Sequence, residues 1–115
     1  MSWITVCEFR NLAAGMPVAV MVDGDAICVV RAGADVFAVH DECTHAAVPL
    51  SEGEVDGATI ECWMHGSKFD LRTGEALTLP AIRPIPTYAA RVLDGRVLID
   101  VGAENDHASA PEVSP

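Results

Sequence analysis

Two short segments of the sequence each place a cysteine close to a histidine. Cys43 and His45 are separated by one residue in the segment DECTHAAVPLSEG, and Cys62 and His65 are separated by two residues in IECWMHGSKFD. Thiolates and imidazoles are common protein ligands for zinc and iron. The sequence therefore presents four candidate metal ligands in two clusters.

Strand-like segments flank both clusters, and a chain of 115 residues forms one domain. Asp23-Gly24 and Asp94-Gly95 separate apolar runs and favour tight hairpins. Glycine and proline are dense over residues 41–87, where we expect loops and short strands that carry the function. The predicted strands are residues 2–7, 18–22, 26–31, 36–39, 89–93 and 96–101.

This pattern predicts an all-β fold, with an antiparallel β-sandwich or meander as its base. We expect a single domain over residues 1–101, with a cluster-binding subdomain at about 41–87. Residues 102–115 lack apolar periodicity, which predicts a flexible C-terminal tail.

Composition and charge restrict the partners and the compartment. The formal net charge is −10, so the chain would be repelled by nucleic acid and attracted to a basic patch on another protein. No apolar run reaches the roughly 18 residues that a membrane span needs, and the first residues do not resemble a signal peptide. We therefore expect a cytoplasmic protein, in which the four cysteines are ligands or buried thiols rather than disulfides. Cys7 and Cys28 lie in apolar runs and are interpreted as core residues.

The order of the four candidate ligands bears on which metal they bind. Two cysteines and two histidines suit a structural zinc site, but zinc fingers usually pair the two cysteines and then the two histidines. Here C-x-H is followed after 16 residues by C-x2-H, so each loop contributes one thiolate and one imidazole. A two-iron centre with both thiolates on one iron and both imidazoles on the other needs one ligand of each type from each loop.

The segments CTH and CWMHGSKFDLRTGE, within residues 2–101, are similar to those of the Rieske ferredoxins, the small electron carriers of multicomponent aromatic-ring-hydroxylating dioxygenases. The resemblance implies the Rieske iron–sulfur fold and one Rieske-type [2Fe–2S] cluster per chain. It implies that Cys43 and Cys62 bind the inner iron and that His45 and His65 bind the outer iron. The protein would then have no catalytic residues of its own.

By the same resemblance, this electron-transfer component would take single electrons from an NAD(P)H-dependent flavoprotein reductase and pass them to a terminal oxygenase. It would act as a monomer, without membrane or nucleic acid. Two alternatives stay open: the small subunit of an assimilatory nitrite reductase, which has the same fold, and a structural zinc module.

Residues near the second cluster suggest further roles. Gly66 and Ser67 are candidates to donate hydrogen bonds to a bridging sulfide, or to form a turn only. Phe69 stands where high-potential relatives have a tyrosine, and the cysteines that form their loop disulfide are absent, so we expect a potential on the order of −150 mV. Trp63 and Met64, together with Pro80, are candidates for an apolar docking collar.

Overall fold

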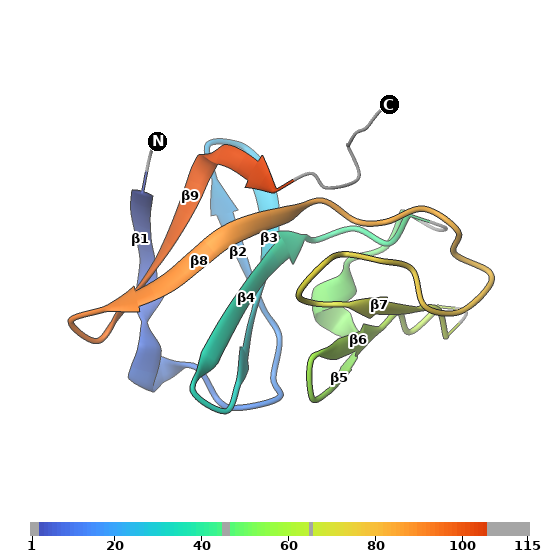
Figure 1. The fold of residues 1–115 in the computed structure, drawn as a ribbon, viewed down its shortest axis with the longest axis horizontal. Helices are drawn as coiled ribbons and strands as arrows, with labels where there is room; N and C mark the ends of the chain where they lie inside the picture. The colour runs from blue at the N-terminus through green and yellow to red at the C-terminus, as the bar shows by residue number, and fades with distance from the viewer. Residues whose placement is uncertain (1–2, 45–46, 65, 106–115) are drawn as a thin grey trace.

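A computed structural model describes residues 3–44, 47–64 and 66–105 of the chain (Figure 1). The strands and short 3-10 helices are β1 (Trp3–Glu8), η1 (Phe9–Asn11), β2 (Val18–Val22), β3 (Asp25–Ala32), β4 (Asp35–His40), η2 (Leu50–Glu52), β5 (Glu54–Asp56), β6 (Thr59–Glu61), β7 (Lys68–Asp70), β8 (Thr87–Leu93) and β9 (Arg96–Asn105). The predicted all-β class is confirmed.

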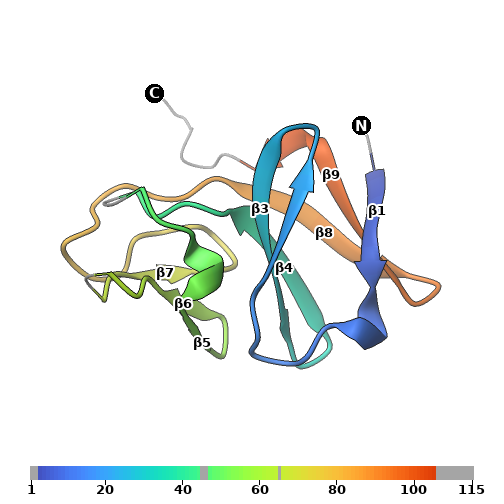
Figure 2. The same cartoon turned by 180° about the vertical axis from the view of Figure 1, so that it is seen from behind.

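Nine strands form two antiparallel sheets within the described ranges. The larger sheet has the order β1-β9-β8-β4-β3-β2, and the smaller one the order β5-β6-β7. Figure 2 shows the small sheet and its loops as a separate lobe at one end of the large sheet.

Both predicted Asp-Gly hairpins are present. Asp23 and Gly24 have φ angles of 51° and 84°, and Asp94 and Gly95 have 53° and 75°. Two successive positive φ angles are those of the type I′ turn, whose twist matches that of the flanking strands. These turns fix the β2–β3 and β8–β9 registers.

The last strand extends beyond its predicted end. We expected the tail to begin at Gly102, but β9 continues to Asn105. The cause is pairing: beyond a register shift between Tyr88 and Ala89, Glu104 lies opposite Tyr88 and Asn105 opposite Thr87, with the extra residues in β9. The rest of the predicted tail, residues 106–115, lies outside the described residues.

The small lobe is an excursion between two neighbouring strands. The chain leaves the large sheet at the end of β4 and returns in β8, which pairs with β4 through Ala38–Tyr88 and Val39–Thr87. The His40 amide also donates to the Pro86 carbonyl at 2.9 Å, so both ends of the excursion lie side by side. Everything between them is therefore held at one end of the large sheet (Figure 1).

Strand β3 explains how the lobe is attached. Its four central residues, Ile27 to Val30, are all fully buried, because the strand has protein on both faces. Ile27 and Val29 belong to the core of the large sheet. Cys28 and Val30 face a second core, which they share with the small lobe. Because successive side chains point to opposite faces, the continuous apolar run packs both cores.

Candidate metal centre

The first Cys/His cluster lies in a loop that a backbone hydrogen bond closes. β4 ends at His40, and the amide of Cys43 donates to the carbonyl of Val48 at 3.0 Å. Cys43 is 3% exposed, so its thiol points into the protein. His45 lies between the two bonded residues in the sequence, but it is outside the described residues.

The second cluster lies in a loop with the same closure. The amide of Cys62 donates to the carbonyl of Ser67 at 2.7 Å, again five residues further along the chain. Gly66, at φ 76°, donates its own amide back to the Cys62 carbonyl at 3.0 Å, and its positive φ gives the tight turn that glycine favours. Cys62 is 1% exposed, and His65 lies outside the described residues.

The structure brings the two cysteines of these loops into one buried cluster. Cys43 and Cys62 pack in the same core as Leu50, Ile60 and Phe69. No disulfide involves any of the four cysteines in the part of the chain that the model describes. Two buried thiols at the bases of two matched loops, each with a histidine in the loop sequence, have the donor chemistry that a two-iron cluster with two thiolate and two imidazole ligands requires. The residues present therefore fit such a cluster.

Cys7 and Cys28 take no part in these loops, as predicted. Cys28 is fully buried in β3, and the pKa of its thiol is raised, first by burial and then by the nearby charge of Asp41. Cys7 is half-buried in β1, and burial raises its pKa as well. A raised pKa keeps a thiol protonated and therefore unreactive, which suits core residues.

A third loop, residues 79–86, is attached to both of the others, a role that we did not predict. The hydroxyl of Thr44, next to Cys43, donates to the Arg83 carbonyl at 2.8 Å. The amide of Ala81 donates to the Ser67 hydroxyl at 3.1 Å. The density of proline at positions 80, 84 and 86 is the sequence signal for this loop, because proline limits the conformations of the unattached chain.

The hydrogen bonds settle the role of Gly66 and limit that of Ser67. The Gly66 amide is taken by the Cys62 carbonyl, so the turn interpretation holds for Gly66. Ser67 is fully buried and its oxygen accepts from Ala81, which leaves the hydroxyl hydrogen for a further acceptor. Phe69 is a core residue without a hydroxyl, as expected.

The segment FDLRTGE forms a turn that local hydrogen bonds hold. The Asp70 carboxylate accepts from the Arg72 amide at 2.7 Å, and the Thr73 hydroxyl accepts from the Glu75 amide at 3.2 Å. Gly74 has φ 81° and accepts from the Ile85 amide, which holds the end of the third loop.

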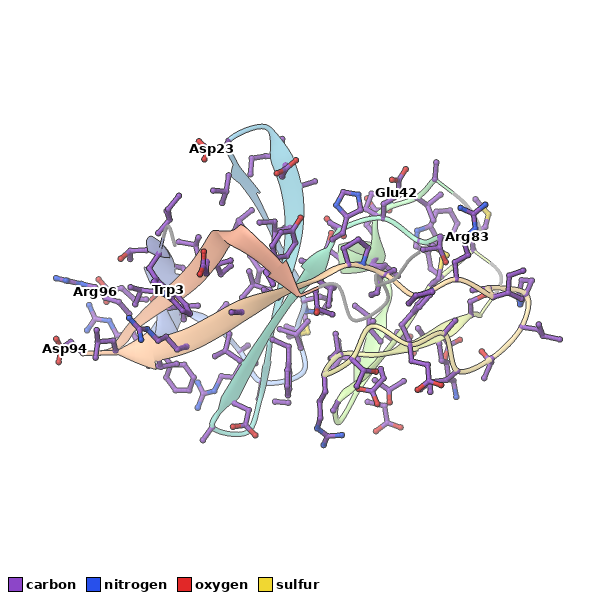
Figure 3. The ribbon with its side chains drawn as sticks, turned by 45° about the horizontal axis from the view of Figure 1, so that its top comes forward. Trp3, Asp23, Glu42, Arg83, Asp94 and Arg96 are labelled. Atoms are coloured by element: carbon purple, nitrogen blue, oxygen red, sulfur yellow. The ribbon has the colours of Figure 1, made fainter. Side chains whose placement is uncertain are left out.

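Exposed apolar side chains gather on the second and third loops. Trp63 and Met64 are about half exposed, whereas Leu79 and Ile82 are 76% and 78% exposed. We call Trp63, Met64, Leu79 and Ile82 the apolar rim. The predicted collar named the first two residues and Pro80, and it missed Leu79 and Ile82. Figure 3 shows Arg83, which follows Ile82, at the end of the molecule far from Asp94 and Arg96.

No helix within residues 3–44, 47–64 and 66–105 is long and apolar enough to cross a membrane.

Comparisons with known proteins agree with the site. A family model of the Rieske [2Fe-2S] domain matches residues 2–89. The 3-phenylpropionate/cinnamic acid dioxygenase ferredoxin subunit of Photorhabdus laumondii is 41% identical over 105 residues, which cover 90% of this chain and 99% of the relative.

Solved structures give the same result. The ferredoxin of carbazole 1,9a-dioxygenase from Nocardioides aromaticivorans is similar at a TM-score of 0.83 and 35% identity, over 86% of this chain and 97% of that one. A chain in a complex of reduced oxygenase and oxidized ferredoxin in carbazole 1,9a-dioxygenase is similar at a TM-score of 0.80 and 34% identity, over 84% of this chain and 91% of that one.

Proposed function

The chain belongs to the Rieske [2Fe-2S] domain family, and we propose that it is the ferredoxin of an aromatic-ring-hydroxylating dioxygenase system. It carries single electrons to the terminal oxygenase and catalyses no reaction itself. The observation that carries this proposal is the burial of Cys43 and Cys62 in one core by two loops of identical closure.

The proposed ligands of the [2Fe–2S] cluster are Cys43, His45, Cys62 and His65. The cluster, when bound, supplies one-electron redox chemistry. Cys43 and Cys62 would hold the inner iron from the buried side, because their thiols point into the core. His45 and His65 would hold the outer iron, because each falls within a loop that a cysteine begins. Leu50, Ile60 and Phe69 exclude water from the two thiolates.

The two alternatives from the sequence are less well supported. A structural zinc site binds its metal equally well when both thiolates come from one loop and both imidazoles from another, so it does not explain why each loop provides both ligand types. The chain also belongs to an iron–sulfur family. A nitrite reductase subunit is disfavoured because relatives at 41% and 38% identity are named as dioxygenase ferredoxin subunits.

The partners are a terminal oxygenase and, as the electron donor, an NAD(P)H-dependent flavoprotein reductase. The oxygenase is supported by the similar chain that is seen in complex with one. We propose that the ferredoxin acts as a cytoplasmic monomer and that the apolar rim contacts the oxygenase. Large exposed apolar side chains suit short-lived complexes, because their burial provides affinity without buried ion pairs. The rim lies on the second ligand loop and on the third loop, which is bonded to both ligand loops, and this keeps the path of the electron short.

Metal analysis and spectroscopy test this function. The purified protein should contain two irons and two acid-labile sulfides per chain, and its dithionite-reduced form should give the EPR spectrum of a Rieske cluster. One zinc with no sulfide would refute the proposal.

Cysteine variants test the ligand assignment. Cys43→Ser and Cys62→Ser should each lose iron and sulfide. The third thiol of this core, that of Cys28, is fixed in β3 and cannot take the place of a missing ligand. Cys7→Ser and Cys28→Ser are the controls and should keep both, although Cys28→Ser places a hydroxyl in the core and lowers stability. Loss of the cluster in both controls, or its retention in both ligand variants, would mean that the ligands are assigned wrongly.

A further inference from the structure

A buried carboxylate lies at the base of the first ligand loop. Asp41 follows the last residue of β4 and precedes Cys43 by two positions. Asp41 is only 8% exposed. The hydrophobic runs and the Cys/His motifs gave no reason to single it out, since an aspartate in a loop is normally exposed.

Both oxygens of this carboxylate accept hydrogen bonds from one residue. The Ser51 amide donates to Oδ1 and the Ser51 hydroxyl donates to Oδ2, each at 2.7 Å. Each carboxylate oxygen therefore acts as an acceptor within this pair. Ser51 belongs to η2, which begins just after the first loop. The pair therefore ties the chain before Cys43 to the chain after Val48.

The backbone of Asp41 is also fixed. Its amide donates to the Ala26 carbonyl of β3 at 3.0 Å. With its main chain held by β3 and its side chain held by η2, the carboxylate has little freedom to turn toward solvent. A charge that is held away from water is screened less than one on the surface.

The charge of Asp41 acts on the core that holds the two ligand cysteines. Cys28 shares this core with Cys43 and Cys62. Asp41 adds to the effect of burial in raising the pKa of the Cys28 thiol, because its negative charge opposes a second one nearby. An electron that arrives at the proposed site is also an added negative charge.

We propose that Asp41 is a positioning and tuning residue whose fixed negative charge lowers the reduction potential of the site. This inference rests on the proposed function, because it takes Cys43 and Cys62 as ligands. Net charge and hydrogen bonding around an iron–sulfur site are two of the features by which proteins set its potential. Asp41 provides the charge, and Ser51 holds that charge in place.

The variant Asp41→Asn removes the charge and keeps the hydrogen bonds. The amide oxygen accepts from the Ser51 amide, and the amide nitrogen donates to the Ser51 hydroxyl. The equilibrium constant for one-electron reduction should rise by roughly threefold to tenfold. Since tenfold is about 59 mV for a one-electron couple, voltammetry should record a potential higher by about 30 to 60 mV. Iron content and the EPR spectrum should stay as in the unchanged protein.

Glu42→Gln is the matched control. It removes the same charge one residue closer to Cys43 in the sequence, but the Glu42 side chain is 50% exposed and lies at the surface (Figure 3). Solvent screens such a charge, so its removal should shift the potential much less than Asp41→Asn does. Equal shifts in the two variants would overturn the proposal.

Ser51→Ala separates charge from structure. This variant loosens the loop but keeps the carboxylate, and it removes a hydrogen-bond donor that partly offsets the negative charge. The potential should stay or fall, which is opposite in sign to Asp41→Asn. If Asp41 were only structural, both variants would loosen the same loop and shift the potential in the same direction.

Two further outcomes would also contradict the proposal. One is an unchanged potential in Asp41→Asn, and the other is failure of Asp41→Asn to load a cluster under conditions in which Ser51→Ala loads one. The proposed function is judged separately, from iron, sulfide and EPR of the unchanged protein.

Discussion

Single residues around the two proposed ligand loops have roles that follow from one or two hydrogen bonds. Ser67 is the clearest case after Asp41, because it is fully buried, two positions after His65, and uses its oxygen to accept from Ala81. Within the described ranges no acceptor is recorded for its hydroxyl hydrogen. A hydroxyl that donates toward a cluster sulfur favours the reduced, more negative state.

Ser67→Ala should therefore lower the reduction potential, measured by voltammetry on the loaded protein. It should also destabilise the protein by about 1–3 kcal/mol, because the Ala81 amide loses its acceptor. Thr78→Val is a suitable control, since it removes the hydroxyl that accepts from the neighbouring Lys68 amide at an exposed position. An unchanged potential in Ser67→Ala would leave Ser67 with a purely structural role.

At the scale of elements, the third loop is the part that joins the two proposed ligand loops. It is bonded to the first through Thr44 and to the second through Ser67, and its end is held by the Ile85 amide on the Gly74 carbonyl. Gly74 is essential to this anchor. A Cβ at position 74 would collide with the Ile85 carbonyl oxygen, and φ is 81°.

Gly74→Ala should reduce the free energy of unfolding by roughly 2–5 kcal/mol, from the left-handed backbone together with the steric clash. Gly57→Ala is the control: its φ is 61°, but nothing lies within 4 Å of the added Cβ, so only the backbone cost of about 1–2 kcal/mol applies. Thermal unfolding of the two variants measures the difference. If both variants lost the same free energy of unfolding, the steric clash with the Ile85 carbonyl would have no energetic cost.

The same loop carries the two most exposed residues of the apolar rim. The double variant Leu79→Ala, Ile82→Ala should raise the KM for ferredoxin in reduction of the oxygenase by at least about fivefold, because two apolar contacts are lost from the complex. Its potential and EPR spectrum should not change. Met21→Ala removes a side chain that is 69% exposed on β2, far along the chain from the loops, and should leave KM as it is. If the double variant behaves like Met21→Ala, the rim is not the docking surface.

At the scale of the whole molecule, the net charge of −10 acts on encounters with partners. Charges that are separated by more than a Debye length, about 8 Å at physiological ionic strength, are largely screened. If the partner presents a basic surface, attraction between the two proteins speeds their association at low salt.

The rate of electron transfer with the reductase should therefore fall by roughly tenfold between low and high salt, measured by stopped-flow spectroscopy. The potential, recorded over the same range of salt, is the control that separates encounter from driving force. A rate that does not change with salt would mean that apolar contact alone governs the encounter.

Local rules determined much of this protein from its sequence. The Asp-Gly turns, the alternating strands that they join and the turn at Asp70 to Gly74 depend on residues close together in the chain. Cys43 and Cys62 could be proposed as ligands for the same reason, since each motif is a short segment with its own signature.

Contacts between distant residues were decided only by the tertiary structure. Ser51 reaches Asp41, Ala81 reaches Ser67, and Arg83 lies against Thr44, although 10 to 39 positions separate the members of these pairs. Nothing in the composition of a loop states which other loop will satisfy its polar groups. That choice depends on where β4 ends and β8 begins, because their pairing brings the ends of the small lobe together and places its three loops side by side.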